Sequence, residues 1–279
     1  DWFKSFSDGL EVDVVDTTDE SGILALQGPR SREILESATG TSFSDLAFSR
    51  SRICELGGVQ VRVIRTGFTG ELGYELWVEP DAAEDAWDAL FKFGTTLGLV
   101  PAGEYAIDIA RVEAGLLIIG SDYKGAGPWH GVDSYPDSRQ ECSPRELNLG
   151  RFVDFSKDHF VGRQALVDEE TRGGPPYRLV GIELTESAVC KLLESEFGSV
   201  LPRVSRTVYQ LNQGTQTVGY VTSLTWAYSL GKIIGLAHVR SVVVDDGKEV
   251  SLVWPSSDED QHLLDARLTE LPFRKHLRK

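Results

Sequence analysis

The sequence has little positive charge for its length. Its 279 residues include 28 Lys+Arg against 43 Asp+Glu, which gives a formal net charge of −15. Because nucleic acids and anionic membranes are bound mainly through clustered Lys and Arg, we expect no nucleic acid and no membrane as a partner. Hydrophobic residues at 41% and charged residues at 25% are nevertheless typical of a folded protein with a core.

Cysteine and histidine are also scarce. The three cysteines, Cys54, Cys142 and Cys190, form no C-x-x-C pair and offer no disulfide framework, which favours a reducing compartment and predicts a cytoplasmic protein. The five histidines show no metal-ligand spacing, so we predict no metal site. No apolar run approaches the ~20 residues that a membrane-spanning helix needs.

Several motifs of well-known enzyme classes are missing. The sequence contains no G-x-x-x-x-G-K-[ST], no strand-linked G-x-G-x-x-G, no H-E-x-x-H and no G-x-S-x-G. P-loop, dinucleotide-binding, zinc-protease and covalent hydrolase functions therefore lack the residues that carry them. Methionine is absent as well, and the sequence begins at Asp1. We therefore expect that residues precede Asp1, or that methionines are missing from the sequence.

The first part of the chain combines strands with helices. Residues 21–27 predict a short buried strand, because they form an apolar run that a Gly-Pro pair ends. Residues 53–64 predict a hairpin, since a Gly-Gly pair separates two alternating runs. Residues 74–79 predict a further strand, whose alternation places Glu75 and Trp77 on one face.

Helices are expected between and after these strands. One follows the first strand. A second is predicted over residues 81–98, where Asp81 and Glu84 have the spacing of a capping box. A third is predicted over residues 104–115, and it places Arg111 on an otherwise apolar stripe.

The second half of the chain changes to short strands. Residues 125–144 are rich in Gly, Pro, Ser and Asp and predict a long surface loop. Residues 171–176 read as a linker, so we predict one domain over residues 1–172 and another over residues 173–279. Strands are expected at residues 178–184, 217–225, 232–239 and 249–254. Turn signals between short strands favour a small barrel or a sandwich.

Five motifs stand out along the chain: LALQGPRS (24–31), RTGFTGELGYELWV (65–78), RVEAGLLIIGSDY (111–123), SPRELNLGRFVDFSKDHFVGRQAL (143–166) and VGYVTSLTWAYSLGKIIGLAHV (218–239). In this order they resemble the glycine-cleavage T-protein (aminomethyltransferase) family, which includes folate-dependent demethylases and the folate-binding ends of dimethylglycine and sarcosine oxidases. The resemblance implies an α+β, multidomain, ring-like fold that holds tetrahydrofolate in a central hole and ends in a β-barrel.

The resemblance also implies candidate ligand-binding residues. Glu75 matches the residue that grips the pteridine, whose adjacent N–H donors suit an ionised carboxylate; the alternative is a solvated strand Glu. Phe68 and Trp77 are expected to flank the flat ring, although Trp77 can equally pack in a core. Arg111 needs an anion, either a carboxylate of folate or of an acidic substrate, or an internal Asp or Glu. Trp226 and Tyr228 are expected to line the site from the barrel.

The family's acidic residue near the reacting folate nitrogen lies in an N-terminal third that the sequence does not match. We therefore name no catalytic residue from the sequence. The C-terminal FRKHLRK also departs from the aromatic tail of glycine-cleavage members.

The function implied by the resemblance is transfer of a one-carbon unit to tetrahydrofolate. The donor is expected to be a small amine, ether or sulfonium compound, or an aminomethyl-lipoyl carrier protein. The excess of acidic residues argues mildly against an acidic carrier, because like charges disfavour the complex. Two alternatives stay open: a folate-binding module without transferase activity, and the folate-binding end of a longer flavoprotein oxidase.

Overall fold

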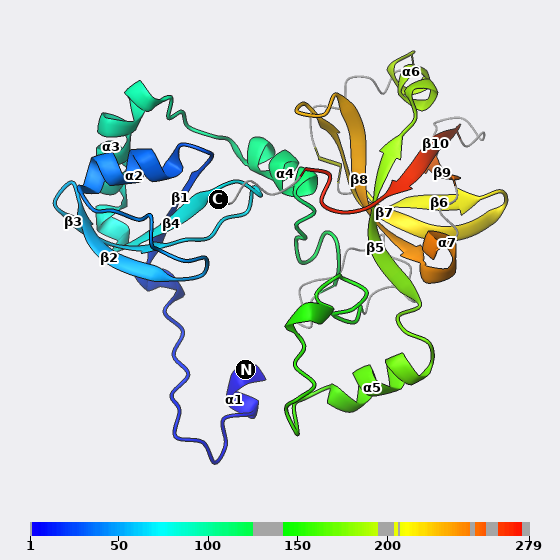
Figure 1. The fold of residues 1–279 in the computed structure, drawn as a ribbon, viewed down its shortest axis with the longest axis horizontal. Coiled ribbons are helices and arrows are strands. Elements are labelled where there is room, and N and C mark those ends of the chain that lie inside the picture. Colours follow the sequence, from blue (N-terminus) through cyan, green and yellow to red (C-terminus); the bar gives the residue numbers. More distant parts are fainter. Residues whose placement is uncertain are drawn as a thin grey trace. The chain divides into compact units, whose positions relative to one another are not determined.

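The computed structural model describes residues 2–124, 142–194, 204–205, 207–245, 249–254 and 262–274. The chain forms two compact units (Figure 1). The first comprises residues 2–67 and 71–101, and the second comprises residues 68–70 and the described residues from 102 onward. The boundary expected between residues 172 and 173 stays a prediction; the strand that opens the barrel of the second unit begins at Tyr177.

The first unit is a four-stranded antiparallel sheet with two helices packed on one face (Figure 1). Across the sheet the strands are β1 (Gly22–Gln27), β4 (Gly73–Val78), β3 (Val59–Ile64) and β2 (Ser51–Leu56). The helices are α2 (Ser31–Thr39) and α3 (Ala83–Gly94). The strands predicted over residues 21–27, 53–64 and 74–79 are therefore confirmed, with small differences at their ends.

Alternation along these strands decides which side chains enter the core. Val61, Val63 and Leu76 face the helices and are fully buried. Each such side chain contributes roughly 1.5–3 kcal/mol through removal of apolar surface from water. Glu75 and Trp77 lie on the opposite face of β4, as predicted, and both are partly exposed. The core therefore leaves these two side chains accessible.

The predicted hairpin turn is present between β2 and β3. Gly57 and Gly58 have φ angles of 63° and 88°, the left-handed conformation that primed turns require. A Cβ at Gly57 would lie 2.6 Å from the Cβ of Ala89 in α3, whereas a Cβ at Gly58 would meet nothing within 4 Å. Both positions therefore favour glycine because of their backbone conformation. Gly57 also requires it because a side chain there would collide with Ala89.

Substitution of these two glycines separates conformation from packing. We expect Gly57→Ala to lower the free energy of unfolding more than Gly58→Ala does, by about 1–3 kcal/mol, because overpacking adds to a similar backbone penalty. Urea unfolding of both variants measures the difference. Equal losses would show that α3 moves away from the turn without cost.

The helix predicted over residues 81–98 is divided into three segments. A 3-10 turn, η2 (Pro80–Ala82), precedes α3, and a second, η3 (Thr95–Leu97), follows it before Gly98. The predicted capping box is wrong. Asp81 lies inside η2, and the N-cap residue of α3 is Ala82, which makes no side-chain capping bond. The remaining short elements of this unit are α1 (Trp2–Ser5) and η1 (Thr18–Glu20).

The second unit is a closed β-barrel with helices and turns around it (Figure 1). The strands follow the order β10-β5-β8-β7-β6-β9, and every pair is antiparallel. Their bounds are β5 (Tyr177–Leu184), β6 (Tyr209–Gln213), β7 (Gln216–Ala227), β8 (Lys232–Arg240), β9 (Glu249–Trp254) and β10 (His262–Thr269). A barrel, rather than a sandwich, is therefore confirmed.

The other described elements of this unit are α4 (Glu104–Glu113), η5 (Gly150–Phe152), α5 (Arg163–Thr171), α6 (Glu186–Glu194) and α7 (Ser241–Asp245). The helix predicted over residues 104–115 corresponds to α4. The predicted loop over residues 125–144 lies outside the described residues except for its last three positions. In the described parts of the chain, no helix is long and apolar enough to cross a bilayer.

The barrel interior is a dense apolar core. Ile182, Val221, Ala237 and Leu252 are all fully buried inside it. A separate cluster that includes Val112 of α4 packs Leu179, Ile234 and Leu236. Strands β5 and β8 therefore bury apolar side chains on both faces: one face packs in the barrel interior, and the other packs in the cluster that contains Val112 of α4.

Candidate functional site

A pocket of about 320 Å³ lies within the second unit. This volume is at the lower end of the ~300–1,000 Å³ range of small-molecule sites. It is lined by Phe68, Ala114, Gly115, Leu116, Leu117, Tyr123, Leu147, Asn148, Leu149, Arg151, Leu179, Leu271 and Pro272. These residues come from the loop between β3 and β4, the segment after α4, the turn before and within η5, strand β5 and the chain after β10.

The pocket walls are mostly aliphatic, and they include few polar groups. Among the described lining residues, Tyr123, Asn148 and Arg151 have polar side chains, and of these only Arg151 is charged. Gly115 has a φ of 68°, and a Cβ there would lie 3.3 Å from the Cβ of Leu271. A pocket of this kind suits a flat, largely apolar ligand with a negative group.

The turn that contributes Asn148 and Arg151 is held by a compact set of hydrogen bonds. Ser143 and Glu146 form a reciprocal capping pair: the Ser143 N–H donates to Glu146 Oε2 at 2.9 Å, and the Glu146 N–H donates to Ser143 Oγ at 3.2 Å. Asn148 adopts a φ of 59°, and its Nδ2 donates to the Leu179 carbonyl oxygen at 2.8 Å. This side of the pocket is therefore fixed to β5.

The opposite wall is fixed by a buried ionic network around Arg111. The guanidinium is fully buried; its Nε donates to Asp108 Oδ1 at 2.7 Å and its Nη1 to Asp122 Oδ2 at 2.6 Å. Its Nη2 donates to Ser223 Oγ at 2.9 Å. Asp122 is fully buried too, and two carboxylates surround one guanidinium.

Hydrogen bonds at Asp122 join this network to the barrel. Its Oδ1 accepts from Ser223 Oγ at 2.6 Å and from Thr222 Oγ1 at 2.7 Å, both on β7. Its carbonyl oxygen accepts from His238 Nε2 on β8 at 2.7 Å. Arg111 Nη1 also donates to the Leu116 carbonyl oxygen at 3.3 Å. The network therefore ties the pocket segment around Leu116 and Tyr123 to two strands.

Arg111 has the internal acidic partners that the sequence left as one alternative. Because Asp108 and Asp122 supply its anions and its side chain is fully buried, a ligand carboxylate is not needed to explain its charge. Direct contact of Arg111 with a ligand stays a prediction. The geometry instead gives it a positioning role for the pocket wall.

The other predicted site residues are distributed over both units. Phe68 lines the pocket and is 36% exposed. Glu75 and Trp77 belong to the first unit, where Trp77 Nε1 donates to Glu75 Oε2 at 3.3 Å. Trp77 also lines a separate hollow of about 230 Å³ with Arg62. The predicted pairing of Glu75 with Trp77 on one face is therefore present, and their ligand roles stay predictions.

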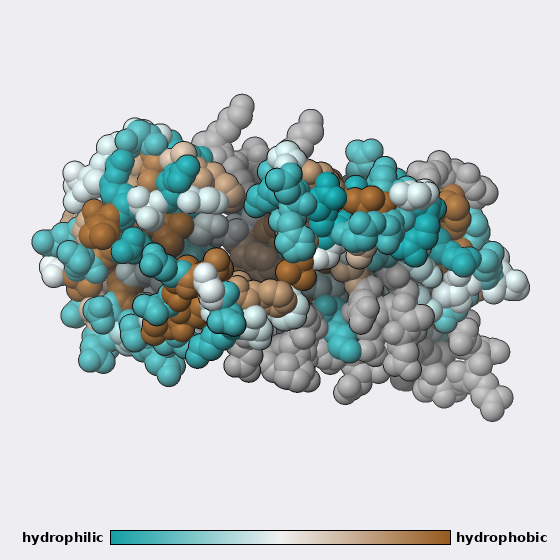
Figure 2. All heavy atoms as spheres, turned by 90° about the horizontal axis from the view of Figure 1, so that it is seen from below, coloured by the Kyte–Doolittle hydropathy of each residue, from teal (hydrophilic) through white to brown (hydrophobic). Residues whose placement is uncertain are grey.

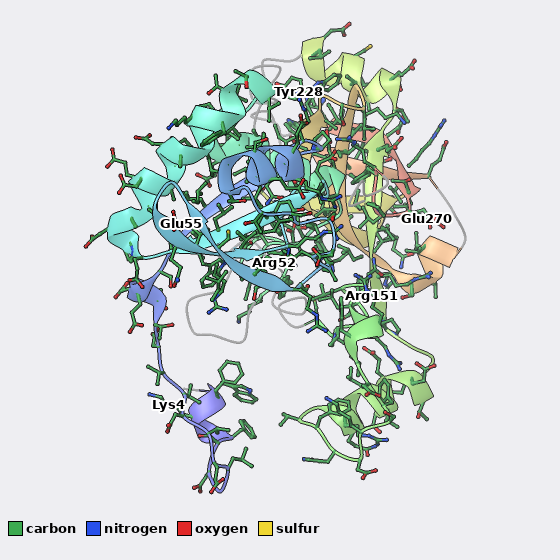
Figure 3. All side chains as sticks on the ribbon, turned by 60° about the vertical axis from the view of Figure 1, so that its left-hand side comes forward. Lys4, Arg52, Glu55, Arg151, Tyr228 and Glu270 are labelled. Carbon is green, nitrogen blue, oxygen red and sulfur yellow. The ribbon has the colours of Figure 1, made fainter. Side chains whose placement is uncertain are left out.

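The barrel residues predicted for the site do not line this pocket. Trp226 is partly buried and packs against the barrel core. Tyr228 is 65% exposed and follows the end of β7. Figure 3 shows Tyr228 far above Arg151, and the strand register agrees, because the end of β7 pairs with Lys232 whereas Tyr177 pairs with Arg240 at the other end of β8. Their roles as lining residues stay predictions without support from this pocket.

Sequence reasoning did not single out Tyr123, Asn148, Arg151 or the Leu271–Pro272 pair. The SPRELNLGRF motif contains Asn148 and Arg151. Its Asn-Leu-Gly run is a turn signal that could have drawn attention to these two residues. Leu271 and Pro272 carry no local signal. They reach the pocket only because β10 closes the barrel beside β5.

The two units, with a sheet covered by helices and a closed barrel that borders a pocket, define a multidomain α+β protein. Comparison with known protein families identifies the family to which the chain belongs. Residues 1–128 match the model of the GCVT N-terminal domain, and residues 178–275 match the glycine cleavage T-protein C-terminal barrel domain. The chain belongs to the glycine cleavage T-protein family.

Curated relatives agree with this assignment. An aminomethyltransferase of Halothermothrix orenii is 33% identical over 252 residues, which cover 90% of this chain and 62% of the relative. An aminomethyltransferase of Moorella thermoacetica is 32% identical over 278 residues, covering 100% of this chain and 66% of the relative. The chain thus spans a little under two thirds of the length of these relatives.

A solved structure supports the fold. The crystal structure of glycine cleavage system aminomethyltransferase T from Bartonella henselae superposes with a TM-score of 0.75 at 21% identity. The match covers 99% of this chain and 65% of that chain. The α+β fold with its C-terminal barrel is therefore confirmed.

Proposed function

We propose that this protein binds tetrahydrofolate and transfers a one-carbon unit to it, as an aminomethyltransferase or a related demethylase. The observation that carries the proposal is the pocket of the second unit, where Phe68 from the RTGFTGELG motif meets aliphatic walls. Such walls favour one flat ring system of a folate. The names of the curated relatives support the same class of reaction.

Each candidate residue has a distinct part in the proposal. Glu75 accepts N–H groups of the pteridine, and the hydrogen bond from Trp77 holds its carboxylate in place. Phe68 packs against a ring of the ligand. Arg111 keeps the wall around Leu116 in position. Glu75 and Trp77 therefore fit the polar ring of a pteridine, and the pocket that Phe68 lines fits an apolar part of a ligand.

The chemistry we propose depends mainly on alignment. Tetrahydrofolate, when bound, supplies N5, the nitrogen that accepts the one-carbon unit. The protein contributes by holding ligand and donor in a reactive orientation and by excluding water, effects that can supply several kcal/mol of barrier reduction. We propose a small amine, ether or sulfonium donor, or an aminomethyl-lipoyl carrier protein, and a cytoplasmic location. The formal charge of −15 favours the small donors over an acidic carrier.

Titration with a folate tests the proposal. We expect 5-methyltetrahydrofolate to bind in calorimetry, and Glu75→Gln to weaken binding about 10- to 100-fold, because a charge-assisted pair of hydrogen bonds is lost. Glu55→Gln is the matched control: Glu55 lies on β2 (Figure 3), on the same face of the sheet, and the substitution removes the same charge.

Two outcomes of this titration, and one of an incubation with tetrahydrofolate and candidate donors, are informative. Absence of folate binding by the protein at its natural length would overturn the proposed function. Equal binding by wild type and Glu75→Gln would remove only the role of Glu75. Binding without 5-methyl or 5,10-methylene product from any donor would favour a folate-binding module that does not transfer the group.

A further inference from the structure

Among the described residues that line the 320 Å³ pocket, Arg151 is the one with a charged side chain. It lies in η5, and its side chain is exposed. Figure 3 shows it close to the lower end of the barrel. The other described residues of the lining offer it no carboxylate, since Tyr123 and Asn148 are the polar residues among them. A guanidinium in such a setting is a ready partner for an anionic ligand group.

The neighbouring arginines are already engaged. Arg111 is paired with Asp108 and Asp122. Arg145 pairs with Glu170 and also stacks over Phe155, with its Cζ 5.3 Å from the ring centroid. Within the described part of the chain, Arg151 has no ion-pair partner of its own, and its Cζ lies 4.6 Å from the centroid of the Phe152 ring.

The stack on Phe152 has a consequence for hydrogen bonding. A guanidinium held against an aromatic ring by cation–π attraction keeps its N–H groups for hydrogen bonds to other partners. Two of these N–H groups form the fork that matches the two oxygens of a carboxylate.

We infer that Arg151 determines specificity by binding a carboxylate of the ligand that occupies this pocket. This inference rests on the proposed function, and it deepens that function by naming the charged group that is recognised. The carboxylate belongs either to the glutamyl tail of the folate or to a small amino-acid donor. In both cases the pocket selects an acidic ligand although the chain as a whole carries a formal charge of −15.

Calorimetry with three ligands distinguishes the two sources. The probes are 5-methyltetrahydrofolate, its uncharged glutamyl diamide, and a tetrahydropterin that lacks the tail. If the tail is recognised, Arg151→Gln weakens binding of the first about tenfold and leaves the other two unchanged, as expected for the loss of one charge-assisted pair. Arg151→Lys, which keeps the charge but not the fork, is expected to recover part of the loss.

A kinetic arm tests the donor as the source. If the donor carries the carboxylate, Arg151→Gln leaves folate binding unchanged and raises the KM for carboxylated amine donors about tenfold, without raising it for uncharged amines. Arg267→Gln is the matched control for both arms. Arg267 lies on β10 in the same unit, its side chain is 72% exposed, and its Nε lies 3.8 Å from Oε1 of Glu249.

Equal behaviour of Arg151→Gln and Arg267→Gln toward every ligand and donor would overturn the inference. If the wild type binds folate and transfers the one-carbon unit in that case, the proposed function stands and only the role of Arg151 is lost. If the wild type binds no folate at its natural length, the proposed function and the inference both fail. Unfolding by urea of both variants ensures that the comparison is made on folded protein.

Discussion

Replacing Asp122 with Ala is expected to lower the free energy of unfolding by about 3–5 kcal/mol, because it leaves the buried Arg111 guanidinium without one of its two carboxylates. The hydroxyl groups of Thr222 and Ser223 lose their acceptor at the same time. Unfolding in urea, followed by fluorescence of the tryptophans, measures the change.

A second substitution identifies the source of this effect. Arg111→Met in the Asp122→Ala background also removes the guanidinium from the buried Asp108 carboxylate, so we expect a further loss of stability rather than a recovery if the buried ion pairs are the source. The control is Asp45→Asn. Arg52 hydrogen-bonds Asp45 at 2.9 Å and holds the pKa of that carboxyl below its ordinary value, yet the pair is exposed (Arg52, Figure 3), so little change is expected. A loss for Asp122→Ala no larger than for Asp45→Asn would contradict the role of the network.

Leu252→Ala is expected to cost about 2–5 kcal/mol of unfolding free energy. Leu252 is fully buried in β9, opposite Leu211 of β6 and Leu264 of β10. Truncation therefore leaves a cavity where the barrel closes, and neither neighbouring strand can collapse into it without breaking its own register. Denaturant unfolding with an unchanged m-value is the expected observation.

The matched control for this cavity is Leu263→Ala. Leu263 precedes Leu264 on β10, is 46% exposed and faces away from the interior. We expect this substitution to lower the free energy of unfolding much less than Leu252→Ala does, because it removes little buried apolar surface. Similar losses for the two variants would mean that β9 does not contribute to a closed core.

Local patterns were sufficient for much of the first unit. The hairpin over residues 53–64 and the strand over residues 74–79 follow from alternation and from a Gly-Gly turn, both of which depend on residues close in sequence. The capping box at Asp81 failed because Pro80 begins a 3-10 turn one residue earlier, and this turn displaces the helix start.

Two barrel strands were not predicted, and the reason lies in their composition. β6 reads YQLNQ, with polar residues at alternate positions and one apolar residue in the middle of them. β10 reads HLLDARLT, in which only Leu264 and Ala266 are buried. Such short amphipathic runs gain their strand conformation from neighbours on both sides of the barrel, which a local pattern does not contain.

The candidate site shows the same limit more clearly. Sequence reasoning placed an anion beside Arg111 and correctly left an internal acid as one alternative. The sequence could not decide between a ligand anion and an internal acid. The decision depends on Asp122 and on Ser223, and these two residues are 101 positions apart in the chain. Arg151 received no attention, since its role depends on the pocket that distant segments form around it.

The hydrogen bonds that hold Asp122 also bear on the order of folding. They join residues separated by 100 to 116 positions in the chain. Contacts of such high sequence separation close large loops and are therefore expected to form after the local β7–β8 pairing that supplies their partners. The pocket is then a late structure, and substitutions in its network should mainly accelerate unfolding rather than slow folding.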